Sequence, residues 1–212
     1  MKLLIAGSFL TLALTFCGMG DRLKSLSGSS DSPSNTAEKP NTGDTNLPDA
    51  ETAKLNAAQK AIADAGKPAN WDQQGISWQV PANWQKMDVS KESLNYGTPA
   101  DGFLIASVSV MNASFPSETS IKATYQSALE QLQQGKYEAV RWVEIDGVKG
   151  VEWIEAMPEE KDAIRRQQWI AFRNYQGQNQ MLNIMVSTKG SNFDKQRDVF
   201  ASILYSMRIP KG

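Results

Sequence analysis

The clearest hydrophobic pattern in the chain is the alternation in residues 102–115, GFLIASVSVMNASF. Leu104, Ala106 and Val108 fall on one side of an extended chain, and serines fall on the other. This alternation predicts a strand with one buried and one mixed face, as is usual in antiparallel sheets. A shorter alternation in ISWQV, residues 76–80, predicts an earlier strand that is followed by a turn at PANW.

Further strands are predicted on both sides of this one. A return strand is expected to begin at Trp84, and residues 95–99 are expected to form a loop. Residues 139–157 are typical of a hairpin, with Asp146-Gly147 as the tight turn. Two more strands, AIRRQQWIAFRNY and QMLNIMVST, are expected to pair across the turn QGQN.

Three stretches have helical periodicity. The first, residues 49–66, has a thin, alanine-rich apolar face and predicts a short helix that ends near Gly66. The second, between Pro116 and Gly135, carries a full apolar stripe: Ile121, Tyr125, Ala128, Leu129 and Leu132. The third, NFDKQRDVFASILYSM, directs Phe193, Phe200, Ile203, Leu204 and Met207 inward. Helices set between runs of hairpin strands indicate an α+β fold. We expect an antiparallel sheet of about six strands with the two main helices on one face.

Residues 1–20 are typical of an export signal. Lys2 precedes an apolar run from Leu3 to Phe16, which suits a signal peptide and is too short to span a membrane as a helix. Cys17, the only cysteine of the chain, directly ends this run, and LTFC followed by glycine resembles a bacterial lipobox. The resemblance implies that Cys17 is lipidated and anchors the protein to a membrane.

Phe16 departs from the lipobox pattern, which has Gly, Ala or Ser just before the cysteine. Three alternatives therefore stay open: ordinary cleavage after Gly20, an uncleaved anchor, and a plain buried cysteine in the signal segment. Residues 21–48 are rich in Ser, Thr, Asn, Pro and Gly and predict a disordered tether. The domain proper is expected over residues 71–210.

The amino-acid composition argues against several classes of function. The chain has no histidine, so Ser-His-Asp and Cys-His catalysis and the usual zinc sites are excluded. A net charge of −1 without a basic stripe argues against nucleic-acid binding. We therefore expect no catalytic residue, no metal and no cofactor. With no cysteine after Cys17 there are no disulfides, and stability must come from the core.

Two stretches remain as candidate sites. Residues 155–162 gather four carboxylates, which suggests either a carboxylate-dependent hydrolase or calcium binding, although the order of ligands in an EF-hand is missing. In RRQQWIAFR, Arg165, Trp169 and Arg173 share one face of a strand. Because Trp and Arg are favoured at interface hot spots, this face is a possible surface for a partner protein. An ordinary solvent-exposed sheet face is the alternative.

Three features together resemble the PsbP-like and DcrB-like α/β sandwich group: the opening ISWQVPANW, the central IDGVKGVEW and the closing FDKQRDVFASILYSMRI. The matching positions are Pro81, Trp84, Phe200, Ile203, Leu204 and Ser206, and the resemblance covers about residues 71–210. It implies a sandwich that serves binding and assembly, without naming a partner, and it carries over no catalytic residue.

The favoured hypothesis is an exported, lipid-anchored, non-enzymatic binding or assembly module with an unknown envelope protein as its partner. The carboxylate-dependent activity at residues 155–162 is the first alternative. The second is a structural spacer that holds another envelope component at a distance.

Overall fold

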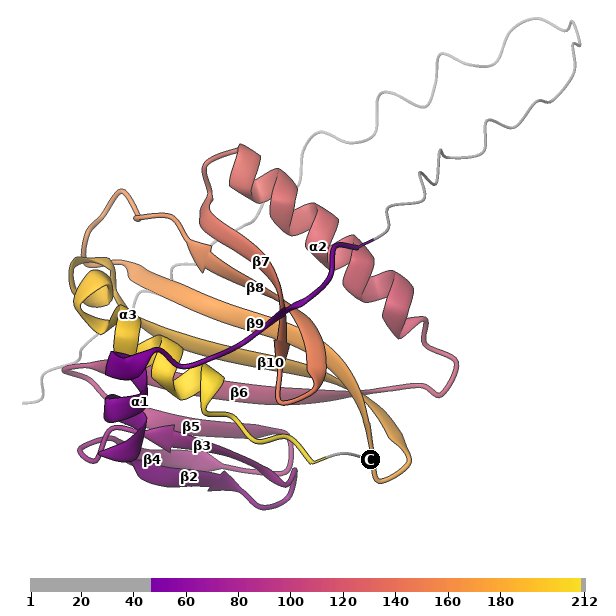
Figure 1. Ribbon diagram of the computed structural model, residues 1–212, viewed down its shortest axis with the longest axis horizontal. Coiled ribbons are helices and arrows are strands. Elements are labelled where there is room, and N and C mark those ends of the chain that lie inside the picture. Colours follow the sequence, from indigo (N-terminus) through magenta and orange to yellow (C-terminus); the bar gives the residue numbers. More distant parts are fainter. Residues whose placement is uncertain (1–46, 211–212) are drawn as a thin grey trace, which may run out of the picture. The chain divides into compact units, whose positions relative to one another are not determined.

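The computed structural model describes residues 47–210, which form one compact unit (Figure 1). Its helices are α1 (Ala57–Asp64), α2 (Ser117–Gln133) and α3 (Gly190–Tyr205). Its strands are β1 (Glu51–Thr52), β2 (Lys67–Trp71), β3 (Ile76–Val80), β4 (Gln85–Val89), β5 (Ser93–Thr98), β6 (Gly102–Met111), β7 (Tyr137–Ile145), β8 (Val148–Glu155), β9 (Ile164–Tyr175) and β10 (Gln178–Lys189). No helix among these residues is long and apolar enough to cross a membrane.

The expected α+β class is confirmed, but the expected sheet of about six strands is wrong. Within residues 47–210, eight strands form one sheet in the order β1-β7-β8-β9-β10-β6-β5-β4, and β2 and β3 form a separate two-stranded sheet. All neighbours in the large sheet are antiparallel except β1 and β7, so the sheet is mixed. Most of the expected loop at residues 95–99 belongs to β5, which pairs with β6. Only Leu94 and Gly97 of this strand are buried, so its sequence shows no clear alternation.

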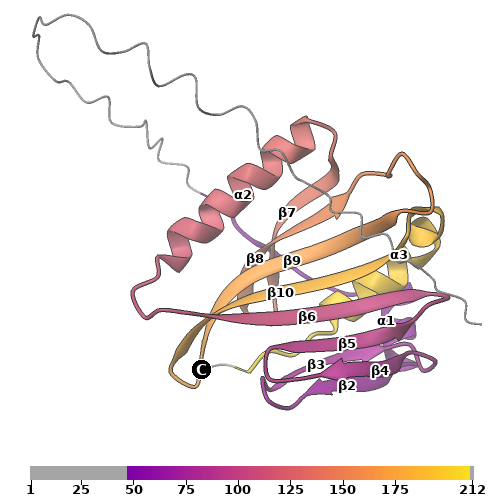
Figure 2. The same ribbon diagram turned by 180° about the vertical axis from the view of Figure 1, so that it is seen from behind.

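The two main helices pack on opposite faces of the large sheet, not on one face as expected. Alternate residues of β9 show this directly, because successive side chains of a strand point to opposite faces. Trp169 lies in the main core with residues of α3, whereas Ile170 packs against a second cluster with Ile121 and Ala128 of α2. Figure 1 shows α3 in front of the strands, and Figure 2, from behind, shows α2 in front.

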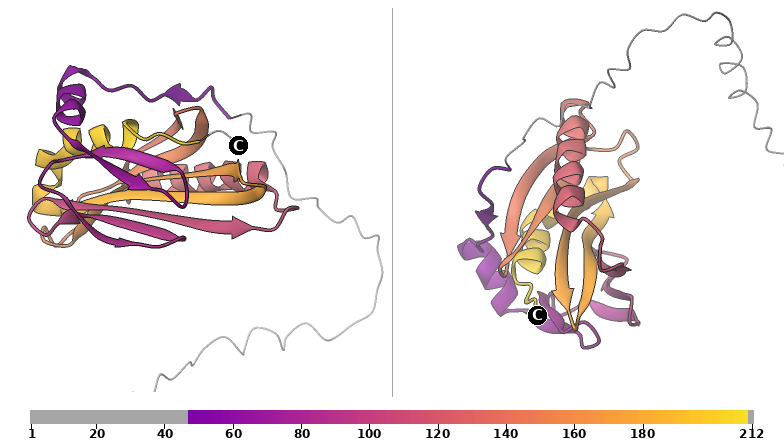
Figure 3. Two further views of the ribbon diagram at one scale, coloured as in Figure 1. Left: turned by 90° about the horizontal axis from the view of Figure 1, so that it is seen from below. Right: turned by 90° about the vertical axis from the view of Figure 1, so that its right-hand side faces the viewer.

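The main core fills the α3 side of the sheet. Four fully buried tryptophans belong to it: Trp71, Trp78, Trp84 and Trp169. The β2–β3 pair and α1 complete this layer, and α1 packs against α3 (Figure 3). Three tryptophans of the main core therefore come from the segment around β2 and β3, so this small sheet is part of the hydrophobic core.

The predicted tight turns are confirmed. Asp146 and Gly147 have φ angles of 49° and 85°, and Gln176 and Gly177 have φ angles of 51° and 73°. Two consecutive residues with positive φ are what a two-residue hairpin needs to match the twist of its strands. These turns set the register of β7 with β8 and of β9 with β10.

The helix expected over residues 49–66 is shorter than predicted. It begins after Asn56, whose side chain accepts a hydrogen bond from the Gln59 backbone N–H at 2.9 Å, while the Gln59 side chain accepts one from the Asn56 N–H at 3.1 Å. This reciprocal cap fixes the start of α1. Glu51 and Thr52, inside the expected helix, instead form a short strand beside β7.

Residues 47–53, here called the strap, connect the two sides of the sheet. Leu47 and Ala50 pack against the cluster under α2, whereas Ala53 packs against the main core on the α3 side. Between them, β1 pairs with β7, and the Ala53 backbone N–H donates to the Glu144 carbonyl at 2.9 Å. The strap therefore passes around the β7 edge of the sheet.

Candidate functional site

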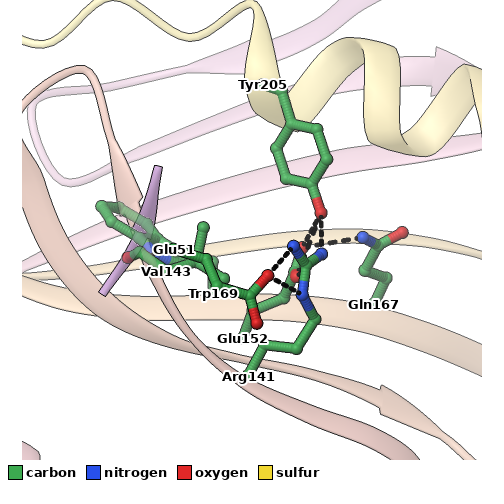
Figure 4. Close-up of polar contacts among 7 residues, drawn as sticks. All are labelled: Glu51, Arg141, Val143, Glu152, Gln167, Trp169 and Tyr205. Atoms are coloured by element: carbon green, nitrogen blue, oxygen red, sulfur yellow. Dashed lines mark hydrogen bonds and ion pairs between the residues drawn. The ribbon is translucent and has the colours of Figure 1, made fainter. Parts of the chain in front are cut away.

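The most buried carboxylate of the domain lies on β8 beneath α3 (Figure 4). Glu152 is 2% exposed and accepts hydrogen bonds from Gln167 at 2.9 Å, from Tyr205 at 3.0 Å and from Arg141 at 3.1 Å. Arg141 also donates to the Tyr205 hydroxyl at 2.8 Å and to Glu51 of the strap at 2.6 Å. We call these five residues the Glu152 cluster; it joins β1, β7, β8, β9 and α3.

Burial raises the pKa of the Glu152 carboxyl, although the Gln167 hydrogen bond and the positive charge of Arg141 oppose this shift. Burial likewise raises the pKa of Tyr205. A carboxyl with a raised pKa can serve as a general acid or base when a substrate reaches it. Both oxygens of Glu152 already have protein partners in an interior site, so the geometry fits a structural cluster rather than a reaction centre.

Arg165, one of the residues predicted for the partner face, lies in the interior. It is 1% exposed, and its guanidinium pairs with Glu138 of β7 and with Asp194 of α3 at 3.2 Å. The guanidinium also stacks over the Phe193 ring, 4.4 Å from the ring centre. Arg165 therefore fastens the start of α3 to the sheet.

The other two predicted residues are buried as well. Trp169 is fully buried beside the β8 backbone, where Gly150 leaves room for its indole: a Cβ at Gly150 would lie 2.7 Å from ring atoms of Trp169. Arg173 is 7% exposed and donates to Gln74 at 2.8 Å and to Gln180 at 3.0 Å. The three residues do share a strand face, but that face is covered, so its interpretation as an exposed docking surface is wrong.

The carboxylates of residues 155–162 do not converge. Glu155 accepts hydrogen bonds from the backbone and the guanidinium of Arg166 at 3.0 and 3.1 Å, and Asp162 accepts one from Ser191 at 3.1 Å. Among residues 47–210, no three His, Cys, Asp or Glu residues lie close enough to hold a metal ion. Cys17 lies outside the described residues, so its lipidation stays a prediction.

An open groove lies on the α2 side of the sheet, and the sequence interpretation missed it. The groove has a volume of about 500 Å³ and is formed by the strap, the first turns of α2 and one residue each from β7, β8 and β9. Its apolar part is Leu47, Ile121, Trp142 and Phe172; its charged part is Asp49, Glu118, Lys122 and Lys149. We call it the α2 groove. No sequence signal marks it, because its residues come from five separate segments.

The charges around the α2 groove are only partly paired. Lys122 contacts Glu118 at 2.9 Å, one turn apart on α2, and both side chains are exposed. Lys149 is exposed on β8 with no carboxylate within 4.0 Å among the described residues. A recess that combines buried apolar side chains, Ile121 and Trp142, with accessible charged ones suits protein recognition.

The described chain is an α+β domain built on a mixed, mostly antiparallel sheet. No known family model matches the sequence, and no curated protein sequence matches it either. Solved structures with similar folds include LpqN of Mycobacterium tuberculosis, described as involved in cell envelope biogenesis, at 15% identity and a TM-score of 0.48, over 68% of this chain and 86% of LpqN.

Two further structures are similar at comparable levels. Cyanobacterial PsbP from Synechocystis has 13% identity and a TM-score of 0.44, over 69% of this chain and 94% of that protein. A Bacteroides thetaiotaomicron protein has 16% identity and a TM-score of 0.45 over 69% of this chain, which spans about half, 49%, of that protein. At these low identities and TM-scores, the likeness, which includes a PsbP, concerns the fold alone.

Proposed function

We propose that this protein is an exported, lipid-anchored binding module that holds a partner protein of the cell envelope in its α2 groove, without catalysing a reaction. The α2 groove carries the proposal, because it is a recess that combines apolar side chains with accessible charges. The buried ionisable groups of the α3 side are instead occupied by one another and are closed to a substrate.

The position of the groove suits an anchored protein. Leu47 and Pro48, the last two residues of the predicted tether, line it together with Asp49. A flexible chain of about 30 residues, the separation between Cys17 and Leu47, spans roughly 30 Å on average. Such a tether would hold the groove near the membrane surface, where a partner anchored in the same membrane is at high effective concentration.

The anchor is tested by replacing Cys17 with serine. We expect the wild-type protein in the membrane fraction, with a mature N-terminus at Cys17 that carries fatty acyl chains in mass spectrometry. The Cys17→Ser protein is expected to be exported without these chains and released from the membrane. A wild-type mature protein that begins at Asp21 and carries no lipid would contradict the anchor and support ordinary cleavage.

The groove is tested by site-specific photo-crosslinking in intact membranes. A photoreactive amino acid at Lys149 of the full chain is expected to give one discrete adduct with a partner. The same amino acid at Lys195, an exposed position of α3 on the opposite side of the sheet, is the matched control and is expected to give none.

A charge reversal inside the groove, Lys122→Glu, should abolish the adduct formed from position 149. This substitution changes an exposed side chain, so the fold is expected to survive it. Adducts that form equally from positions 149 and 195, or that persist with Lys122→Glu, would count against the groove.

A further inference from the structure

The two edges of the large sheet differ in how far they are open to another strand. β4, at one edge, has five residues and a bulge between Lys86 and Asp88 that interrupts its regular pairing. Short strands and bulges are two ways in which proteins protect a sheet edge from adding further strands. β7, near the other edge, has nine residues and pairs regularly with β8 from Ala139 onward.

Only a small part of the outer side of β7 is covered. β1 pairs with Val143 and Glu144 alone, and no other strand of residues 47–210 lies on that side. The strap then turns toward the α2 groove, where Leu47 lies among residues of α2 and β9. The stretch from Ala139 to Trp142 is therefore left without a neighbouring strand on its outer side.

The strap itself demonstrates that this edge binds an extended chain. The Glu144 carbonyl points outward, because it accepts the hydrogen bond of the Ala53 N–H at 2.9 Å. Backbone groups of a strand alternate in direction with a period of two residues, so those of Trp142 and Val140 also point outward. β1, the strand already paired here, places the Glu51 carboxylate 2.6 Å from the Arg141 guanidinium. Side chains beside this edge therefore also contact the added chain.

The side chains along the free stretch indicate what the added chain contains. Val140 and Trp142 lie on the α2 side and pack against the cluster that includes Tyr125. Trp142 also lines the α2 groove, so the free edge and the groove form one continuous surface. An extended segment with an apolar residue beside Val140 would make both backbone hydrogen bonds and apolar contacts there.

We infer that the outer edge of β7, from Ala139 to Trp142, is a strand-addition site for an extended segment of the partner protein. The inference rests on the proposed function and assigns the partner a chemical form: an exposed, extended peptide with an apolar side chain directed to α2. Its hydrogen bonds go to the N–H and the carbonyl of Val140 and to the N–H of Trp142, because β1 already occupies the Trp142 carbonyl where Glu51 pairs beside Val143. The adjacent α2 groove receives the flanking residues.

The test uses the full mature chain and peptides selected on it from a phage-displayed random library. A selected peptide is synthesised again with a methyl group on one backbone amide at a time. Loss of affinity should recur at every second amide, by about tenfold for each lost hydrogen bond. Hydrogen exchange on the protein should slow at Val140 and Trp142 when the peptide binds.

Val140→Pro removes one outward N–H of β7 and should weaken peptide binding by about tenfold. Met87→Pro, which places the same residue on the β4 edge, is the matched control and should leave binding unchanged. If Val140→Pro alters the circular dichroism spectrum, the methylated peptides, which leave the protein unchanged, decide the question.

Failure to select any peptide, effects of methylation without a two-residue period, or slowed exchange away from β7 would each overturn the inference. None of these results would affect the crosslink from position 149. If that crosslink forms, the proposed function stands without the strand-addition site. Absence of that crosslink would instead refute the proposed function itself.

Discussion

Replacing Trp169 with alanine will lower the free energy of unfolding by about 3–5 kcal/mol, measured by urea denaturation. Trp169 has no exposed surface and lies at the centre of the main core, between the β8 backbone and α3. Its removal leaves a large cavity that the sheet and α3 can close only in part. A loss of this size is a large part of the whole stability of a typical domain.

The comparison with Trp169→Phe makes this prediction specific. Phenylalanine keeps most of the buried apolar volume and should cost clearly less than alanine. An exposed tryptophan on a docking face would behave differently, because substitutions at such positions change stability by less than about 0.5 kcal/mol. A Trp169→Ala protein as stable as the wild type would therefore restore the partner-face interpretation that the burial contradicts.

Replacing Arg141 with leucine will destabilise the domain by about 3–5 kcal/mol near neutral pH, since it leaves a buried carboxylate without its cation. Glu152 would retain only Gln167 and Tyr205, two neutral donors, in a site that is 2% exposed. Arg208→Leu is the matched control. Arg208 is mostly exposed and contacts Asp146 at 3.4 Å, so its loss should cost less than about 1 kcal/mol.

The loss caused by Arg141→Leu should depend on pH in a defined direction. The pKa of Glu152 is already raised in the folded protein, and removing the Arg141 charge raises it further. The folded state then holds this proton more tightly than the unfolded state does, so stability falls as pH rises from the unfolded pKa to the folded pKa.

Urea denaturation of wild type and variant should therefore show a smaller difference at about pH 3, below the ordinary glutamate pKa of the unfolded state, than at about pH 8. The double variant Arg141→Leu, Glu152→Gln should regain much of the stability at about pH 8, because no buried charge remains. An equal loss at both pH values would show that the packing of the Arg141 side chain, not its charge, stabilises the cluster.

Much of the fold could be predicted from the sequence because several elements have strong local signals. The alternation around Leu104 and Ala106 and the Asp146-Gly147 turn each determine local structure with little tertiary help. β5 and β1 have no such signal. β5 is mostly polar and becomes a strand through its pairing with β6, and the two residues of β1 become one only through contact with β7.

The choice of sheet face shows why the candidate site could not be predicted. Alternation correctly placed Arg165, Trp169 and Arg173 together, but it carries no information on which face a helix covers. The charged residues at two of these positions suggested exposure. In the folded chain each arginine obtains buried partners from distant segments, Asp194 of α3 for Arg165 and Gln74 of the β2–β3 turn for Arg173.

The strap is the part of the described domain that a pulling force on the preceding chain reaches first. A pull on the chain ahead of Leu47 reaches the apolar contacts of Leu47 and Ala50 first, and then the two paired residues of β1. Those few contacts would peel away one after another before tension reached the reciprocal cap of α1 or the four tryptophans behind it. The strap would thus detach first and let the chain lengthen under tension, while strands β4 to β10 and the main core stay folded.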